Sequence, residues 1–278
     1  MQTNIVFFGS SAYILPILEK LQKNFAISLV VTTEKSITDA VPSYCQKNNI
    51  EYISTTSLTD AKLQKKLQQI KAPVAVLADF GLLIPQSVLD IFPKGIVNIH
   101  PSLLPKYRGS TPGVSAIANG DTTTGISIML LDNKLDHGPL LAQEKADILP
   151  TDTGKSLYQR LFAQSSEILL PTLTKYLQNE LTPKPQDESQ ATYTKPLTKE
   201  SGFVTIDNPP ANLVNIIKAY YPWPGVWTKM MLFGKEKIVK LLPENMLQVE
   251  GKKPMSVKDF LNGYPDTKEQ LKHLVSQS

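Results

Sequence analysis

Cysteine is almost absent from this chain of 278 residues, because Cys45 is the only one. A single thiol forms neither an internal disulfide nor a multi-cysteine metal site, which fits a reducing compartment. No apolar run approaches the length that spans a bilayer, and the N-terminus lacks the pattern of a secretory signal. We therefore expect a cytoplasmic protein with no membrane partner.

The glycine motifs of nucleotide-binding proteins are also missing. Gly9-Ser10-Ser11 follows the first apolar run, but it has one glycine where the dinucleotide fingerprint needs three. This glycine segment also lacks the GK[ST] sequence of a P-loop, and the chain has no internal repeat and no low-complexity segment. These absences argue against a dinucleotide or P-loop enzyme.

The excess of positive charge is small and lies in the C-terminal part. The chain has 17 basic and 17 acidic residues up to Thr194, and 12 basic and 8 acidic residues from Lys195 onward, so the net charge of +4 arises there. A mildly basic segment is compatible with a polyanion such as RNA, and equally with a solvated lysine-rich surface.

Strand-like and helix-like segments alternate through the first 180 residues. Helical periodicity extends to about Lys23 and recurs over 57–70, over 85–91 and over 153–177, where Thr153 or a residue near it is the expected cap. The segments that predict strands are 4–8, 27–32, 74–78, 95–100, 125–131 and 139–148. This alternation predicts an α/β, Rossmann-like, mostly parallel sheet with helices on both faces.

Composition changes near residue 181. LTPKPQDESQA at 181–191 is polar and contains proline, as in a linker or a long surface loop. The expected domains are 1–180, a linker at 181–205 and a small β-rich domain at 206–278. In the last of these we expect a short helix over 212–221, strands over 225–242 and 245–249, and a helical turn at 257–261.

The most informative segment is GIVNIHPSLLPKYRG at 95–109. Asn98 and His100 stand two apart in a strand-like run, so they should project from one face, and Pro101 then ends the strand. An amide can donate to an oxyanion, an imidazole can move a proton, and a carboxylate such as Asp136 can orient that imidazole. The set suits acyl transfer, although a lone His100 would more often be a core histidine bonded to backbone.

A metal site is the other interpretation of the segment DNKLDHG at 132–138. Asp132, Asp136 and His137 are close in sequence, but Asp136 and His137 would point in different directions on an extended segment. No second cluster of His or Cys completes a ligand set. We expect no metal.

NIHPSLLPKYRG and the following GDTTTGISIMLLDNKLDHGPLL at 120–141 closely resemble the formyltransferases that use 10-formyltetrahydrofolate, most of all the methionyl-tRNA formyltransferases. The resemblance also covers IVFFGSSAYILPILEKL, VLADFGLLIP, TYTKPLTKESGFV, YYPWPGVWT and GKKPMSVKDFLNGYP, in the order of the family. It implies transfer of a formyl group from 10-formyltetrahydrofolate to the amino group of initiator methionyl-tRNA, by a cytoplasmic monomer with an OB-like C-terminal domain.

The resemblance also implies site residues. Asn98, His100 and Asp136 match the catalytic residues of the family. Arg108, taken alone, suits either anion recognition or loop anchoring. The residues implied in acceptor binding are Gly9, Ser10, Lys35 and Arg108, and those implied in folate binding are Phe80, Gly81, Leu82, Leu83, Ile84, Ser102, Leu103, Leu104, Pro105 and Leu135.

Two departures bear on the acceptor. The loop at 32–42 is short, with Lys35 as its only cation, and the C-terminal domain is shorter than is usual in the family. We therefore expect weaker or more salt-sensitive tRNA binding. The alternatives are a sugar-nucleotide amine formyltransferase, a formyltetrahydrofolate hydrolase and a non-catalytic RNA-binding module. TGISIM and KPLTKESG favour the tRNA enzyme over the first, and the intact catalytic set argues against the last.

Overall fold

A computed structural model describes residues 2–34 and 39–271 and divides the chain into two units. Unit 1 comprises Met1–Pro112, Thr124–Asp147 and Tyr158–Thr194. Unit 2 comprises Gly113–Thr123, Ile148–Leu157 and Lys195–Ser278. Each unit therefore contains stretches that are far apart in the sequence.

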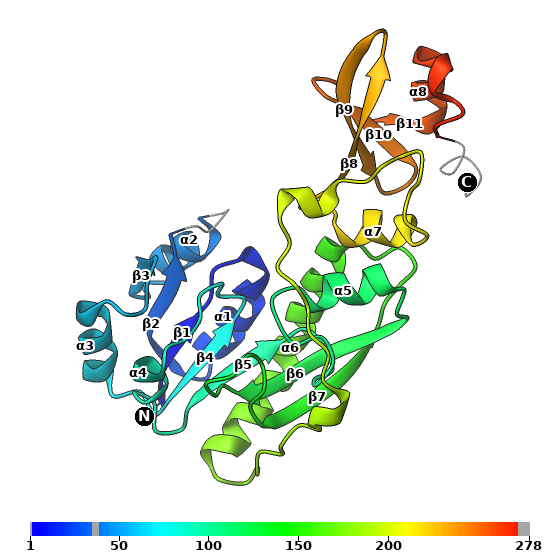
Figure 1. The fold of residues 1–278 in the computed structure, drawn as a ribbon. Helices are drawn as coiled ribbons and strands as arrows, with labels where there is room; N and C mark the ends of the chain where they lie inside the picture. The colour runs from blue at the N-terminus through cyan, green and yellow to red at the C-terminus, as the bar shows by residue number, and fades with distance from the viewer. Residues whose placement is uncertain (1, 35–38, 272–278) are drawn as a thin grey trace. The chain divides into compact units, whose positions relative to one another are not determined.

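The first seven strands form one sheet in the order β3-β2-β1-β4-β5-β6-β7 (Figure 1). The pairs that join β1, β2, β3, β4 and β5 are parallel, whereas β6 runs antiparallel to β5. This confirms the expected Rossmann-like, mostly parallel sheet. The strands are β1 (Asn4–Phe8), β2 (Ala26–Thr33), β3 (Tyr52–Thr55), β4 (Val74–Ala78), β5 (Ile96–His100), β6 (Thr123–Leu130) and β7 (Leu140–Asp147).

The order in which the chain adds strands to the sheet reverses between β1 and β4. Strands β2 and β3 continue to one side of this point and β5 to the other, which makes it a topological switch point. In the register, Leu77 of β4 lies opposite both Phe8 of β1 and Asn98 of β5. Asn98 and His100 therefore end a strand beside the switch point, where ligands bind in open α/β sheets.

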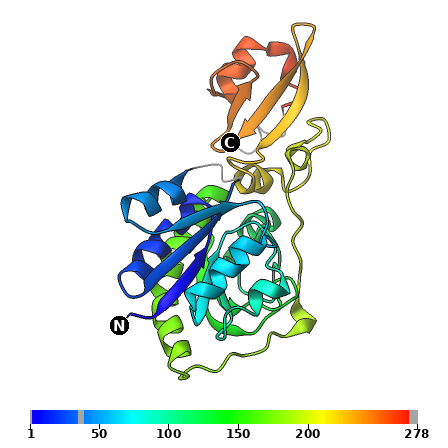
Figure 2. The ribbon, with the colours of Figure 1, turned by 90° about the vertical axis from the view of Figure 1, so that its left-hand side faces the viewer.

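Helices cover both faces of the sheet (Figure 2). Leu63, Leu67 and Val88 of α3 and α4 share one core cluster with Phe8 and Val31. On the other face, α1 and α6 are joined by the ion pair of Lys20 and Glu167 at 2.7 Å. The helices up to residue 177 are η1 (Ala12–Ile14), α1 (Leu15–Gln22), α2 (Ala40–Lys47), α3 (Ala61–Ile70), α4 (Gln86–Leu89), α5 (Pro112–Asn119) and α6 (Gly154–Leu177).

The helix expected over 57–70 begins only at Ala61. The Asp60 side chain accepts a hydrogen bond from Leu63 N at 2.8 Å, so Asp60 is the N-cap and the helix starts after it. Elements α2, β3 and α5 were not expected from the sequence.

The polar stretch expected to be a linker or a surface loop makes specific contacts within unit 1. Lys184 and Leu140 form a bridge with two backbone hydrogen bonds of 2.7 and 2.9 Å. Arg108 forms a second bridge with Tyr193. The prediction of a linker at 181–205 stays a prediction, while residues 184–194 are bonded to the sheet and its loops.

Unit 2 contains an antiparallel sheet in the order β11-β10-β9-β8. Its core includes Val226, Val239 and Phe260, and Trp227 packs on Phe203 with ring centroids 4.9 Å apart. The β-rich character expected here is confirmed. The elements are η2 (Glu188–Gln190) in unit 1, then η3 (Lys199–Gly202), α7 (Leu213–Ala219), β8 (Val226–Leu232), β9 (Lys235–Leu242), β10 (Met246–Val249), β11 (Met255–Ser256), α8 (Val257–Gly263) and η4 (Pro265–Thr267).

The length and hydropathy of the helices decide whether any of them could cross a membrane. Within residues 2–34 and 39–271, none of the helices combines the length and the apolar character needed to cross a bilayer.

Candidate active site

Strand β5 positions the first two side chains of the site. All five of its residues are buried, and Asn98 and His100 keep only 5% and 4% of their surface exposed. Since β5 lies between β4 and β6, its backbone is held on both sides. A buried amide and a buried imidazole therefore project from a rigid element.

The hydrogen bond of His100 fixes its tautomer. Nε2 lies 2.9 Å from the carbonyl oxygen of Tyr107, which only accepts, so Nε2 carries a proton. A proton that enters or leaves the ring must then do so at Nδ1. That atom lies 3.7 Å from Oδ2 of Asp136.

Asp136 completes the set from the loop after β6. Its φ of 45° is in the left-handed region, and its side chain is 12% exposed. Oδ2 accepts a hydrogen bond from Gly109 N at 2.7 Å, and Oδ1 accepts a longer one from Asn98 Nδ2 at 3.4 Å. The structure thus brings Asn98, His100 and Asp136 together around one carboxylate.

Side chains from β6 and β7 hold the loop at 101–109 in place. Ser127 Oγ donates to Ser102 O at 2.7 Å and accepts from Leu104 N at 3.0 Å. Gln143 Nε2 adds a bond of 2.8 Å to Leu104 O. Gly109 ends the loop at a φ of 112°, where a Cβ would lie 2.6 Å from Thr194 Oγ1. Glycine is required here for both reasons.

Arg108 is 1% exposed and its guanidinium is fully engaged. It donates to Gln186 Oε1 at 2.8 and 3.2 Å and to the Glu188 carboxylate at 2.5 and 2.9 Å. It also donates to Tyr193 Oη at 3.2 Å. The hydrogen bond to Glu188 raises the pKa of Arg108 above its ordinary value, more than burial lowers it. Of the two interpretations of Arg108, this geometry supports loop anchoring.

The residues expected at the folate differ in exposure. Leu83 is 85% exposed and Leu135, directly before Asp136 in the sequence, is 49% exposed, so two large apolar side chains stand in solvent. Gly81 has a φ of 84°. Among the others, Phe80, Ser102 and Leu104 are buried, and Leu82, Ile84, Leu103 and Pro105 are half-buried.

Gly9 and Ser10, two of the residues expected at the acceptor, directly follow β1. Ser10 Oγ donates to Phe80 O at 3.1 Å and accepts from Thr33 N at 3.1 Å, so it ties three strand ends together. The backbone at Gly9 passes close to the end of β4, since a Cβ there would lie 2.8 Å from Ala78 O. Lys35 lies outside the residues that the structure describes. Acceptor contacts of Gly9, Ser10, Lys35 and Arg108 stay predictions.

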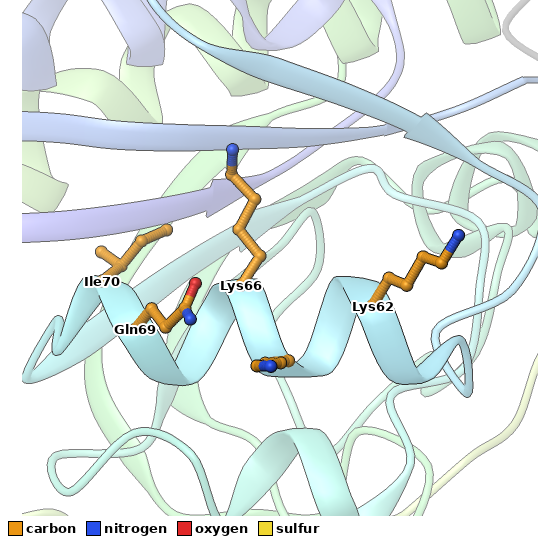
Figure 3. A pocket seen from close by; sticks show the side chains of 5 residues that line it. Lys62, Lys66, Gln69 and Ile70 are labelled. Carbon is orange, nitrogen blue, oxygen red and sulfur yellow. The ribbon is translucent and has the colours of Figure 1, made fainter.

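A separate hollow of about 480 Å³ lies along α3. It is lined by Lys62, Lys65, Lys66, Gln69 and Ile70, most of which are labelled in Figure 3. Lys66 forms an ion pair with Glu51. The hollow contains none of the expected site residues and no acid–base pair of its own lining side chains, so we place the candidate site at His100 instead.

His137 lies beside the site. Its Nδ1 is 2.5 Å from Asp132 Oδ2, and its Nε2 is 3.5 Å from Glu188 Oε1. Over the part of the chain that the structure describes, no group of three or more His, Cys, Asp or Glu side chains has an arrangement that could hold a metal ion.

Sequence reasoning missed the groups that hold His100, Asp136 and Arg108 in place through hydrogen bonds. They are Tyr107 O, Gly109 N and the side chains of Gln186 and Glu188. The backbone groups have no residue type to reveal them. Gln186 and Glu188 lie in a polar stretch whose composition resembles any surface loop.

Comparison with known proteins places this geometry in a context. A profile of the formyl transferase family matches residues 3–173. A methionyl-tRNA formyltransferase of Roseiflexus sp. (strain RS-1) is 37% identical over 238 residues, which are 82% of this chain and 73% of that protein. One from Thermus thermophilus is 37% identical over 246 residues, which are 86% of this chain and 78% of that protein.

Solved structures share the fold at lower identity. A 4-N formyltransferase from Francisella tularensis has a TM-score of 0.68 at 18% identity, and the match covers 87% of this chain and 98% of that one. Glycinamide ribonucleotide transformylase 1 from Symbiobacterium toebii has a TM-score of 0.59 at 23% identity, covering 67% of this chain and 95% of that one.

Proposed function

Since the chain belongs to the formyl transferase family, we propose that it transfers a formyl group from 10-formyltetrahydrofolate to the amino group of initiator methionyl-tRNA. The two relatives described above, each 37% identical, are methionyl-tRNA formyltransferases, and the matches cover 73% and 78% of their length. The observation that carries the proposal is the meeting of Asn98, His100 and Asp136 at one carboxylate, in a chain of this family.

The amide of Asn98 would stabilise the oxyanion. The amine of methionine attacks the formyl carbon, and the carbonyl oxygen takes up negative charge in the tetrahedral species. An amide nitrogen carries two N–H donors, and the bond of Asn98 to Asp136 uses one of them. A donor of this kind typically contributes about 3–4 kcal/mol to the transition state.

The pair of His100 and Asp136 would carry the proton. The attacking amine must lose a proton, and the leaving folate nitrogen must gain one when its bond to the formyl carbon breaks. Nδ1 of His100 is the ring position open to exchange, and Oδ2 of Asp136 faces it at 3.7 Å. We assign the proton transfer to the pair and not to either residue alone.

The folate and acceptor assignments rest on exposure and position. Leu83 and Leu135 are large apolar side chains in solvent, and covering them with a pterin would remove apolar surface from water. We propose that they face the folate, with the rest of 80–84 and of 102–105 around it. Gly9 and Ser10, at the end of β1, are proposed to lie toward the acceptor.

Unit 2 is proposed to contact the tRNA. It includes the part of the chain with 12 basic and 8 acidic residues. Trp223 is 56% exposed and Phe233 is 80% exposed, and exposed aromatic rings can stack on bases. The domain limits of 1–180, 181–205 and 206–278, the OB-like comparison, the monomeric state, the cytoplasmic location and the absence of a required metal stay predictions.

In vitro formylation tests the function. The purified protein is incubated with formyl-folate and, in separate reactions, with initiator methionyl-tRNA, an amino-sugar nucleotide, or no acceptor. We expect formyl-methionyl-tRNA in the first reaction only. Formylated sugar in the second, or acceptor-independent release of formate in the third, would contradict the proposal and support the sugar enzyme or the hydrolase.

A further inference from the structure

Gln186 lies in a segment whose position is fixed from both sides. Before it, Lys184 pairs with Leu140 at the start of β7 through two backbone hydrogen bonds. After it, the 3-10 helix η2 begins at Glu188. The segment thus passes close to the loop that carries Asp136, and the Gln186 side chain is half-buried.

The side-chain amide of Gln186 is bonded at both ends. Its Nε2 donates to the carbonyl oxygens of Asp136 at 2.9 Å and of Gly138 at 2.8 Å. Its Oε1 accepts from Arg108 Nε at 3.2 Å and Nη2 at 2.8 Å. Two N–H donors and two acceptor positions are the full capacity of an amide, so Gln186 links the loop at 132–138 to the loop at 101–109.

The Asp136 loop needs such a link. Asp136 holds a φ of 45°, which costs a non-glycine residue free energy relative to extended or helical backbone. Turning the peptide at 136 would swing the side chain away from both Gly109 N and His100 Nδ1. The two bonds from Gln186 to carbonyl oxygens oppose that rotation.

At its oxygen end, the Gln186 amide bonds to Arg108 and so helps to orient the N–H of the next residue, Gly109. Arg108 N donates to Thr192 O at 2.8 Å, and Thr194 N donates to Arg108 O at 2.7 Å. With its backbone and its guanidinium both held, Arg108 fixes the direction of the next N–H, which is the donor to Asp136 Oδ2. The Gln186 amide therefore supports the Asp136 carboxylate in two ways. It holds the main chain of Asp136 directly, and through Arg108 it holds the Gly109 N–H that donates to the carboxylate.

We infer that Gln186 is a positioning residue, which acts through the main chain of Asp136 and Gly109 to hold the Asp136 carboxylate against His100. It does not touch the reacting atoms. The inference rests on the proposed function for its kinetic consequence, whereas its structural consequence is independent of any substrate.

Two variants test this inference and separate the halves of the amide. Gln186→Met has a similar length but neither donates nor accepts strong hydrogen bonds. Gln186→Glu keeps oxygen atoms for Arg108 and loses the donors to the two carbonyls, so it also serves if the methionine variant fails to fold. Gln190→Met is the matched control, because exposed Gln190 donates to Asp187 in the same segment.

For both Gln186 variants we expect a kcat lower by about 10- to 100-fold, with each KM changed by less than about threefold. The control should retain kcat within about twofold. When Asp136→Asn is already present, Gln186→Met should lower kcat by less than about twofold, because the group it positions is gone. An equal loss in both backgrounds would overturn the inference.

A substrate-free readout keeps the two proposals apart. The Gly109 amide should exchange its hydrogen faster in both Gln186 variants than in the control, because its acceptor moves away. Unchanged exchange at Gly109 would overturn the inference even if activity fell. A wild-type protein inactive on methionyl-tRNA would overturn the proposed function, and the exchange measurement would still decide the role of Gln186.

Discussion

Oδ2 of Asp136 faces Nδ1 of His100 at 3.7 Å, although helix α5, strand β6 and their connecting loops separate the two residues in the sequence. The separation is longer than a direct hydrogen bond, and both side chains are largely buried. A small movement, or the arrival of a substrate amine between them, would complete a path for a proton. Catalytic hydrogen bonds are often long without substrate.

Replacing any member of this set should therefore lower turnover much more than folate binding. For Asn98→Ala we expect a kcat lower by about 10²- to 10³-fold, and for His100→Ala and Asp136→Ala a loss of about 10²- to 10⁴-fold. Steady-state kinetics together with a direct measurement of folate affinity check this. Asp90→Asn, an exposed carboxylate bonded to Gln86, is the control. Near-normal turnover of the Asp136 variant would remove the mechanism.

Arg108 should act as an anchor and not as a phosphate contact. Arg108→Met removes the charge and the planar donors that reach Gln186, Glu188 and Tyr193, so we expect a lower melting temperature and a lower kcat. The slope of log Kd for tRNA against log salt should stay the same. A slope reduced by about one would instead indicate a lost phosphate contact. Lys106→Ala, an exposed cation in the same loop, is the comparison.

Gly138 should be essential for the shape of the Asp136 loop. A Cβ there would lie 1.9 Å from Leu130 O, which is backbone and cannot move aside cheaply. We expect Gly138→Ala to reduce the free energy of unfolding by about 3 kcal/mol or more, measured by denaturant titration. Gly263→Ala in α8 has nothing within 4 Å of its Cβ and should be neutral or slightly stabilising. Equal stability of the two variants would contradict the steric argument.

The sequence predicted those parts of the site that depend on local periodicity. The two-residue spacing of Asn98 and His100 and the stop at Pro101 follow from strand geometry, and the structure places both side chains at the end of β5. The residues alone offered Asp136 only as one candidate carboxylate, and the family resemblance singled it out, because its approach to His100 depends on how β6 pairs with β5. Element β3 was missed since its residues are only partly buried and show no clear alternation.

The contacts around Arg108 could not be predicted for a related reason. Its partners Gln186 and Glu188 lie 78 and 80 residues away, in a stretch with the composition of a solvated loop. Local composition reports what a segment tends to do alone, whereas these side chains are ordered by a buried cation that the rest of the fold puts beside them.

Asp79 should destabilise the protein at neutral pH. It follows β4 at the switch point, and although the residue is exposed, the protein atoms around its carboxyl raise its pKa by desolvation, more than the hydrogen bond with Ser11 lowers it. A raised pKa in the folded state favours folding below the unfolded pKa of about 3.9, and this advantage is lost as pH rises through the folded value. Asp79→Asn should therefore raise the melting temperature at pH 8, and the gain should shrink toward pH 4.

Asparagine suits this test because it tolerates the φ of 45° that Asp79 adopts. Asp90→Asn again provides the control, since Asp90 is also exposed but lies away from the switch point, after α4. A gain that is the same at every pH would show that desolvation of the Asp79 charge is not its origin.

Ending the chain after Thr194 should damage more than the segment it removes. Unit 2 also contains 113–123 and 148–157, and their polar groups are bonded to the later part. Asn212 Nδ2 donates to Ala118 O at 2.8 Å, Lys218 Nζ donates to Pro150 O at 2.8 Å, and Lys155 N donates to Tyr221 O at 3.2 Å.

Truncation would leave Ala118 O and Lys155 N without these partners and would uncover apolar surface that unit 2 buries. We expect chain 1–194 to melt at a lower temperature than the full chain and to bind a hydrophobic dye. Asn212→Ala in the full chain removes one of these bonds alone, so it should cost only about 1 kcal/mol. If chain 1–194 melted as the full chain does, residues 113–123 and 148–157 would hold their structure without the rest of unit 2.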